Sequence, residues 1–144
     1  MAAQVTSLHP VGKWIHAVED SAGEFNRTLR TICARDPSQH AHAVRMCLEA
    51  LRTFGRLHGM QRGALLLRTA GRVNILGTHI DHRGGSVNPV AINHLWLVAS
   101  PRDDDLVVAR NVESRQFPEE RFRIGACLPA GAGIADWDAW CHAE

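Results

Sequence analysis

The chain has 144 residues, of which 45 % are hydrophobic and 22 % charged, and its formal net charge is +1 with histidine neutral. This length suits one soluble domain, and the near-zero charge excludes a general attraction to nucleic acid or to an anionic membrane. No apolar stretch approaches the ~20 residues of a membrane span, and the N-terminus lacks the regions of a signal peptide, so we expect a cytoplasmic protein. Cys33, Cys47, Cys127 and Cys141 form no C-x-x-C pair, and we expect them to be reduced thiols.

Residues 8–58 show the spacing of helices. Pro10 can open a first helix whose apolar face carries Trp14, Ile15 and Val18. Ser21 and Glu24 then have the spacing of a capping box, which predicts the start of a second helix.

A third, longer helix is predicted after Asp36 and Pro37, which suit the N-cap and the first helical position. Its apolar stripe consists of Val44, Cys47, Leu48, Leu51 and Phe54. Gly55 or Gly59 can end this helix. His40 and His42 lie near its start with no partner suggested, and we expect them on the surface.

Strands are predicted from Gly63 onward, where the apolar spacing changes. Residues 65–69 and 73–76 form one strand or two nearly continuous ones. Residues 95–100 and 106–110 are expected to pair as a hairpin across a polar turn, and the alternation in residues 121–124 predicts another strand.

The chain is therefore divided into a helical segment, residues 1–60, and a β-rich part, residues 61–144. Near the end, Asp136 has the character of an N-cap, and Trp137 and Trp140 share one face of the helix that would follow. Two tryptophans are a large apolar area for so short a helix, which suggests that the chain is truncated and that both are partly uncovered.

The densest set of hydrogen-bonding residues follows the first apolar strand. Residues 70–85 read Ala-Gly-Arg-Val-Asn-Ile-Leu-Gly-Thr-His-Ile-Asp-His-Arg-Gly-Gly. A strand that ends in polar side chains can present a ligand site on a rigid support. Gly84 and Gly85 can adopt positive φ and allow the backbone to approach a ligand closely.

Each of these polar residues also has a simpler interpretation. Arg72 and Asp81 could form only an ion pair, and His79 or His82 could be a loop histidine with satisfied hydrogen bonds. His79, Asp81 and His82 could ligate a metal, but three clustered residues without a distant fourth make a poor closed zinc site. We therefore expect no metal site.

The stretch resembles the sugar-binding signature of galactokinases, a branch of the GHMP kinase superfamily. The matching positions are, in order, Gly71, Arg72, Asn74, Gly77, His79 and Asp81, continued by Gly85, Val87, Pro89, Ala91 and Ile92. The resemblance implies an α+β domain that forms the N-terminal part of the GHMP kinase fold, related to the second domain of ribosomal protein S5. Helices would pack on a mixed β-sheet, with the sugar loop between strands.

The resemblance also implies roles for individual residues. Arg72, which is permanently charged, would act as a catalytic residue beside the reacting oxygen and phosphate. His79 and Asp81 would bind sugar hydroxyls, since a carboxylate can accept hydrogen bonds from two adjacent hydroxyls. Gly84 and Gly85 would let the backbone fold over the sugar. We expect Arg72, His79 and Asp81 to converge on one concave surface.

Two substitutions in the motif bear on the substrate. Thr78 stands where galactokinases have a Glu near the sugar's C6 hydroxyl, and His82 stands where they have a Tyr. This variant resembles the galacturonate kinases of the same branch. A neutral Thr78 removes the like-charge repulsion that a Glu would exert on a C6 carboxylate. Asn74 is expected to brace the loop.

The resemblance further implies an ATP-dependent sugar 1-kinase, of which this chain would be the sugar-binding N-terminal portion. The substrate would be galactose or a C6 variant such as galacturonate. The serine-rich phosphate loop of GHMP kinases does not occur in these residues. ATP and Mg²⁺ would serve the full-length enzyme, the chain alone would hold no cofactor and be inactive, and its partners would be the sugar and the remainder of the kinase. The alternatives are a non-catalytic sugar-binding or sensing module derived from a galactokinase, and a remnant without a ligand.

Overall fold

The computed structural model describes residues 8–33, 36–76 and 84–127, and within these it describes the backbone but not the side chains of residues 93 and 94. The chain forms two compact units, residues 1–100 and residues 101–144, which are described separately. In chain order the elements are β1 (His9–Pro10), α1 (Val11–Glu19), α2 (Glu24–Ile32), α3 (Pro37–His58), β2 (Gly63–Leu76), β3 (Asn88–Ala99), β4 (Leu106–Ala109), β5 (Glu120–Arg123) and the 3-10 helix η2 (Ile124–Cys127). This is an α+β structure with antiparallel sheets, as expected at that level.

Helices α1 and α2 begin as their local sequence allows. Pro10 occupies the N-cap of α1, so the first helix starts at the predicted place. The predicted capping box of α2 is wrong, because Gly23 and not Ser21 is the N-cap. The carboxylate of Asp20 accepts a hydrogen bond from the Ala22 N–H, and this local turn sets the start of α2 at Glu24.

Helix α3 has the predicted start and ends at one of the two predicted glycines. The Asp36 carboxylate accepts hydrogen bonds from the backbone N–H groups of Ser38 (2.8 Å) and Gln39 (3.3 Å). These bonds, together with one from the Ser38 hydroxyl, lower the pKa of Asp36 below its ordinary value. Gly59 ends the helix with φ 91°, a conformation that favours glycine.

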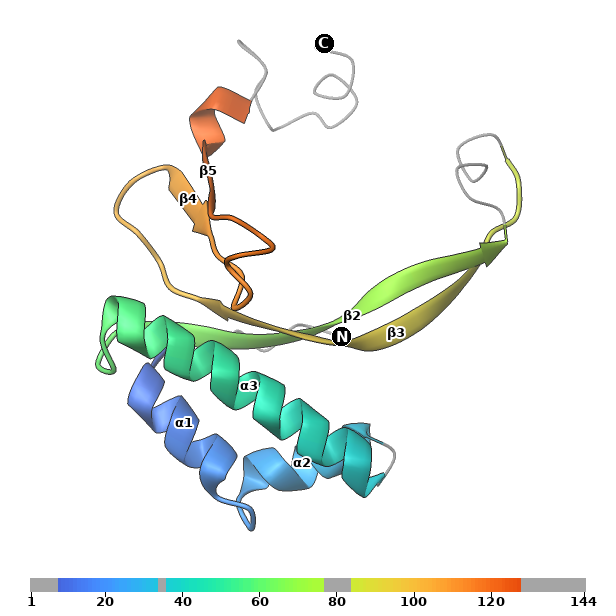
Figure 1. The fold of residues 1–144 in the computed structure, drawn as a ribbon, viewed down its shortest axis with the longest axis horizontal. Coiled ribbons are helices and arrows are strands. Elements are labelled where there is room, and N and C mark those ends of the chain that lie inside the picture. The colour runs from blue at the N-terminus through green and yellow to red at the C-terminus, as the bar shows by residue number, and fades with distance from the viewer. Residues whose placement is uncertain (1–7, 34–35, 77–83, 128–144) are drawn as a thin grey trace. The chain divides into compact units, whose positions relative to one another are not determined.

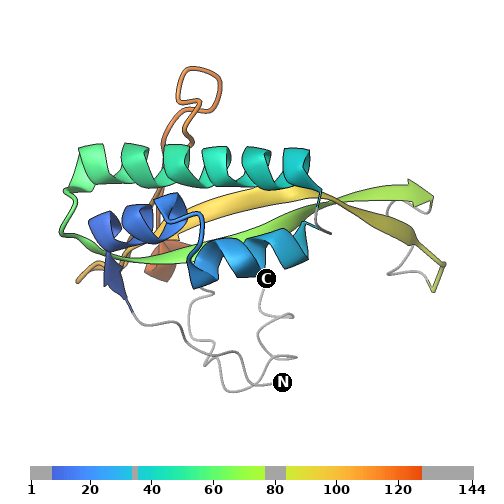
Figure 2. The ribbon, with the colours of Figure 1, turned by 90° about the horizontal axis from the view of Figure 1, so that it is seen from below.

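Strands β2 and β3 form a long antiparallel ribbon, with the short β1 paired to the start of β2. The region that the sequence left open as one strand or two is one strand, interrupted by register shifts after Ala70 and after Asn74. Figures 1 and 2 show the three helices on one face of this ribbon, with α1 and α2 following one another alongside α3. The ribbon continues beyond the end of the helical layer (Figure 1).

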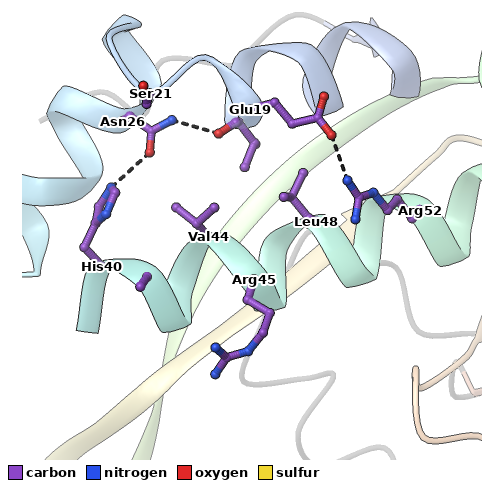
Figure 3. Close-up of a pocket in the computed structure, with 10 residues that line it drawn as sticks. Glu19, Ser21, Asn26, His40, Val44, Arg45, Leu48 and Arg52 are labelled. Carbon is purple, nitrogen blue, oxygen red and sulfur yellow. Dashed lines mark hydrogen bonds and ion pairs between the residues drawn. The ribbon is translucent and has the colours of Figure 1, made fainter. Parts of the chain in front are cut away.

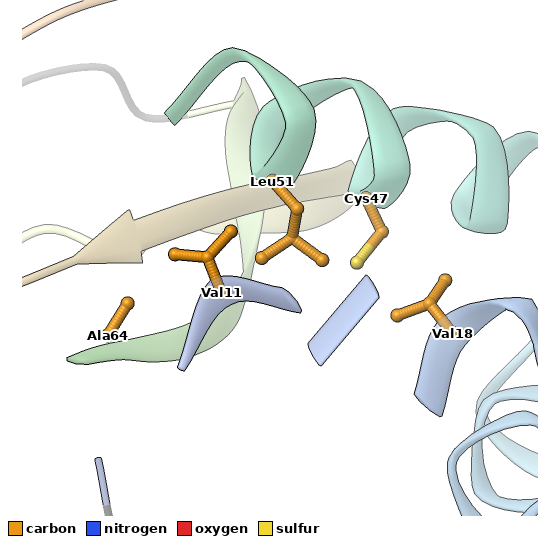
Figure 4. Close-up of a cluster of buried hydrophobic side chains, with 5 residues drawn as sticks. All are labelled: Val11, Val18, Cys47, Leu51 and Ala64. Atoms are coloured by element: carbon orange, nitrogen blue, oxygen red, sulfur yellow. The ribbon is translucent and has the colours of Figure 1, made fainter. Parts of the chain in front are cut away.

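The main core lies between the helices and the near half of the ribbon. Its buried residues are Val11, Val18, Cys47, Leu51 and Ala64 (Figure 4). Burial raises the pKa of the Cys47 thiol to about 12, so this free cysteine is chemically inert. The indole N–H of Trp14 donates to the carbonyl of Ala64 at 2.9 Å and thereby fixes α1 to β2.

The second unit contains a small two-stranded sheet. Strand β4 pairs with β5, from Leu106 opposite Arg123 to Ala109 opposite Glu120. The predicted hairpin between residues 95–100 and 106–110 is therefore wrong, because β3 pairs with β2 in the first unit. The alternating strand predicted at residues 121–124 is confirmed as β5, Glu120–Arg123. Among the described helices, none is both long and apolar enough to cross a bilayer.

Candidate functional site

The polar motif begins on the far half of the ribbon. Arg72 lies opposite Ala91, and Asn74 lies opposite Pro89. Because side chains two residues apart in a strand point to the same face, Arg72 and Asn74 lie next to each other on that face. The Arg72 side chain is exposed, which leaves its guanidinium accessible to a ligand.

Asn74 has a further property that suits a site. Its side chain is half-buried, and its Oδ1 atom is shielded from solvent without a hydrogen-bond partner. A shielded carbonyl oxygen without a donor costs free energy. Asn74 is therefore an available acceptor beside Arg72, and its expected role in bracing the loop stays a prediction.

The connection between β2 and β3 contains the remaining motif residues. Strand β2 ends at Leu76 and β3 begins at Asn88, so the predicted sugar loop joins two paired strands. Thr78, His79, Asp81 and His82 lie outside the described residues. Their expected convergence with Arg72 is accordingly not tested by the geometry.

The glycines that follow these residues are described. Gly84 has φ 78°, and a Cβ built there would meet no heavy atom within 4 Å. The need for glycine therefore comes from the backbone conformation alone, which costs other residues about 1–2 kcal/mol. Positive φ was expected of the glycines here, and Gly84 confirms it for one of them.

A second hollow lies among the three helices, with a volume of about 480 Å³ (Figure 3). Its polar residue Asn26 is only 2 % exposed and is fully engaged. The Asn26 amide donates to the carbonyls of Val18 (2.8 Å) and Asp20 (2.9 Å), and its Oδ1 accepts a hydrogen bond from His40 Nε2 at 2.9 Å. The expectation that His40 has no partner is wrong.

The sequence gave no signal for this cluster. Asn26 and His40 lie on different helices and only the packing of α2 on α3 brings them together. The other ion pair in the hollow joins Glu19 and Arg52 at 2.7 Å. Since these polar groups bind one another, the hollow is a joint between helices and a weaker candidate site than the ribbon.

The described residues contain no group of three or more His, Cys, Asp or Glu that could hold a metal ion. Among the described residues, no side chain combination is arranged for metal chemistry. The expected metal-free character concerns residues 77–83 as well, and there it stays a prediction.

Comparison with known proteins points to one family. Residues 52–101 match the model described as the galactokinase galactose-binding signature. The galactokinase of Candida parapsilosis is 34 % identical over 90 residues, which is 62 % of this chain and 17 % of the relative. Galactokinases of Chloroflexus aggregans (38 % over 60 residues) and Schizosaccharomyces pombe (40 % over 57 residues) also match, over 41 % and 40 % of this chain and 15 % and 11 % of their own lengths. No solved structure is significantly similar to the chain.

The matched residues fall on the part of the fold that carries the polar motif. They cover the end of α3, strand β2, the connection and strand β3, all within the first unit except Pro101. The chain spans less than a fifth of the length of the curated relatives it matches. The predicted resemblance is confirmed, and the sequence is galactokinase-like in this region.

Proposed function

Since residues 52–101 carry the galactose-binding signature of galactokinases, we propose that this chain is the sugar-binding portion of an ATP-dependent sugar 1-kinase. The observation that carries the proposal is the place of the signature in the fold. Exposed Arg72 and half-buried Asn74 share one face of β2, directly before the connection that contains His79 and Asp81. A paired ribbon is the rigid support that such a loop needs.

Within this function, the motif residues divide the work by their chemistry. The Arg72 guanidinium stands beside the reacting hydroxyl and stabilises the negative charge of the transferred phosphoryl group. Asp81 accepts hydrogen bonds from two sugar hydroxyls, and His79 contacts a third. Gly84 and Gly85 bring the backbone over the sugar, which the positive φ of Gly84 supports.

Phosphoryl transfer needs groups beyond this set. ATP and Mg²⁺ supply the phosphoryl group and neutralise its charge in the full-length enzyme. The phosphate loop and the catalytic base come from further residues of the kinase. The α+β first unit is compatible with the N-terminal part of the GHMP kinase fold, and we place it there as part of the same proposal.

The substrate class is inferred from positions 78 and 82. A neutral Thr78 permits a carboxylate at C6 of the sugar and can donate a hydrogen bond to it. Replacing one charged contact in a partly solvated site changes discrimination by about 1–3 kcal/mol. We therefore infer a preference for galacturonate over galactose, and His82 contributes to it when protonated.

The test is a titration of the 144-residue chain, labelled with ¹⁵N, with galactose, galacturonate and glucose, followed by NMR. Galacturonate and galactose are expected to shift the Arg72 Nε–H signal and the amides of Gly84 and Gly85, whereas glucose, the C4 epimer, shifts them less. Arg72→Met should weaken binding about 10–100-fold, the effect of losing hydrogen bonds from a charged group. Arg56→Met is the matched control, because Arg56 is an exposed arginine on α3 that bonds only to Thr53 among the described contacts.

Shifts confined to other regions, or equal losses in Arg72→Met and Arg56→Met, would contradict the site. A preference for galactose that Thr78→Glu does not increase would contradict the C6 assignment alone. A sugar-binding module without catalysis is the second candidate, and the observation that favours it is a galactose-binding signature in 144 residues without a serine-rich phosphate loop. Sugar 1-phosphate formed by a chain that includes any downstream coding sequence would support the kinase, and binding without turnover would support the module.

A further inference from the structure

The near half of the β2–β3 ribbon has two apolar faces, and the helices cover only one of them. Leu66, Trp96 and Val98 point toward the helices and pack against the core. The alternating positions point the other way. Two of these, Leu95 and Leu97, are 58 % and 55 % exposed.

The uncovered face continues along the far half of the ribbon. Leu67 lies opposite Leu97 at the near end, and it is 42 % exposed. Beyond the register shift after Ala70, the extra residue in β3 restores the alternation. Val73 then lies opposite Val90 on the same face as Leu67.

Two isoleucines complete this surface. A Cβ added to Gly71 would lie 3.2 Å from Ile92 Cγ1, so Ile92 leans over Gly71 on this face. Ile75 follows two residues after Val73 and is 62 % exposed. Seven side chains, those of Leu67, Val73, Ile75, Val90, Ile92, Leu95 and Leu97, therefore make up one surface, the aliphatic face.

The aliphatic face is unusually large for a monomer. Each of its side chains is between 41 % and 62 % exposed. Together they present on the order of 600 Å² of aliphatic surface, which is the upper end of what a typical monomer exposes and marks an interaction site. The positions of the two strands that point to this side contain no charged residue.

The chemistry of the aliphatic face selects its partner. A surface without charge offers nothing to attract a charged ligand or a polar peptide, but it is complementary to itself. Two such ribbons can stack face to face at the ~10 Å spacing of packed sheets and bury on the order of 1,200 Å² in total, which is the lower range of specific interfaces. We propose that a second copy of this chain covers the aliphatic face, with the two ribbons related by a twofold axis.

This interface is compatible with the sugar site without depending on it. Arg72 and Asn74 alternate with Gly71 and Val73 along β2, so they point away from the aliphatic face. The dimer therefore leaves both polar side chains free. Loss of the dimer and loss of sugar binding are separate results, because they concern opposite faces of the ribbon.

The test is sedimentation equilibrium of the 144-residue chain between about 1 and 100 μM, with the wild type expected to reach twice its mass of 15.9 kDa. Leu95→Glu and Val73→Glu place a charge at the two halves of the face and should each weaken dimerisation at least 100-fold. Leu57→Glu is the matched control, because Leu57 is 48 % exposed on α3, away from this face. Its dimerisation should equal that of the wild type, and circular dichroism should be the same for all four proteins.

Three results would overturn the proposal. One is a wild-type chain that stays monomeric at 100 μM, which would mean that the face is open or belongs to another partner. Another is growth beyond the dimer without saturation, which is aggregation and not a twofold interface. The last is a dimer that Leu57→Glu weakens as much as Leu95→Glu and Val73→Glu do, since the contact would then lie elsewhere.

Discussion

Asn26 is the residue through which the three helices are joined by polar contacts. Both hydrogens of its amide are donated to carbonyls at the end of α1, those of Val18 and Asp20. Its Oδ1 can then only accept, so the Nε2 atom of His40 must carry the proton in their 2.9 Å hydrogen bond. A buried amide satisfied in this way positions α1, α2 and α3 against one another.

Replacing Asn26 should therefore destabilise the protein more than replacing its partner. Asn26→Ala leaves two carbonyls and His40 without partners and is expected to lower the free energy of unfolding by about 2–3 kcal/mol, whereas His40→Ala should lower it by about 1 kcal/mol. The measurement is urea unfolding followed by circular dichroism. His42→Ala is the matched control and should change stability by less than about 0.5 kcal/mol, because His42 is exposed. Equal effects of all three substitutions would contradict the role of Asn26.

Local chemistry at single residues could be predicted from the sequence, but contacts between distant residues could not. Asp36 and Gly59 act within a few bonds of their own positions, and both have the predicted roles. The Asn26–His40 hydrogen bond depends on how two helices pack, which no local pattern encodes. In the candidate site, Arg72 could be assigned from the ordered motif, and the structure adds its exposure and its neighbour Asn74.

At the scale of elements, the start of α3 depends on the charge of Asp36. The pKa of Asp36 is lowered by the hydrogen bonds from Ser38 and Gln39, so the folded state favours its ionised form. A carboxyl group whose folded pKa is below its unfolded value stabilises the fold above the unfolded pKa. This contribution is lost as the pH falls through the folded pKa, which lies below 3.8.

Asp36→Ala should therefore lower the urea midpoint at pH 7, and the difference from the wild type should shrink as the pH falls below about 4. The reason is that a protonated Asp36 accepts these hydrogen bonds more weakly. Asp36→Asn is the control, because its amide oxygen can cap the helix at every pH without titrating. A difference between wild type and Asp36→Ala that stays constant from pH 7 to pH 2.5 would show that the charge of Asp36 has no role.

The pairing of strands shows why element order alone misled the hairpin prediction. A short polar turn between two apolar strands is a good hairpin signal, but β3 pairs instead with β2, across the connection that holds the motif. That pairing lets Trp96 and Val98 reach the helical core. Burial against the helices therefore decides the partner of β3, and burial is not visible in a local pattern.

At the scale of the whole chain, buried residues are confined to the first unit. All the buried hydrophobic residues of the described chain, from Val11 to Ala64, lie in residues 1–100. The described part of the second unit, residues 101–127, has no buried side chain. It is held by the β4–β5 pairing and by exposed ion pairs such as Arg102 with Asp104 at 2.8 Å. Exposed pairs of this kind add little stability.

The last prediction follows from this division. Residues 1–100 should fold without residues 101–144, with the same helical circular dichroism and the same urea midpoint as the whole chain at equal concentration. Leu51→Ala tests whether the two proteins share one core, because Leu51 is fully buried and its truncation should cost about 2–5 kcal/mol in both. Ser100 has to be kept, since its hydroxyl accepts a hydrogen bond from Arg62 Nε at 2.7 Å. If residues 1–100 show no cooperative transition, or if Leu51→Ala affects the two proteins differently, the second unit contributes to the core and the division between Ser100 and Pro101 does not describe the folding of this protein.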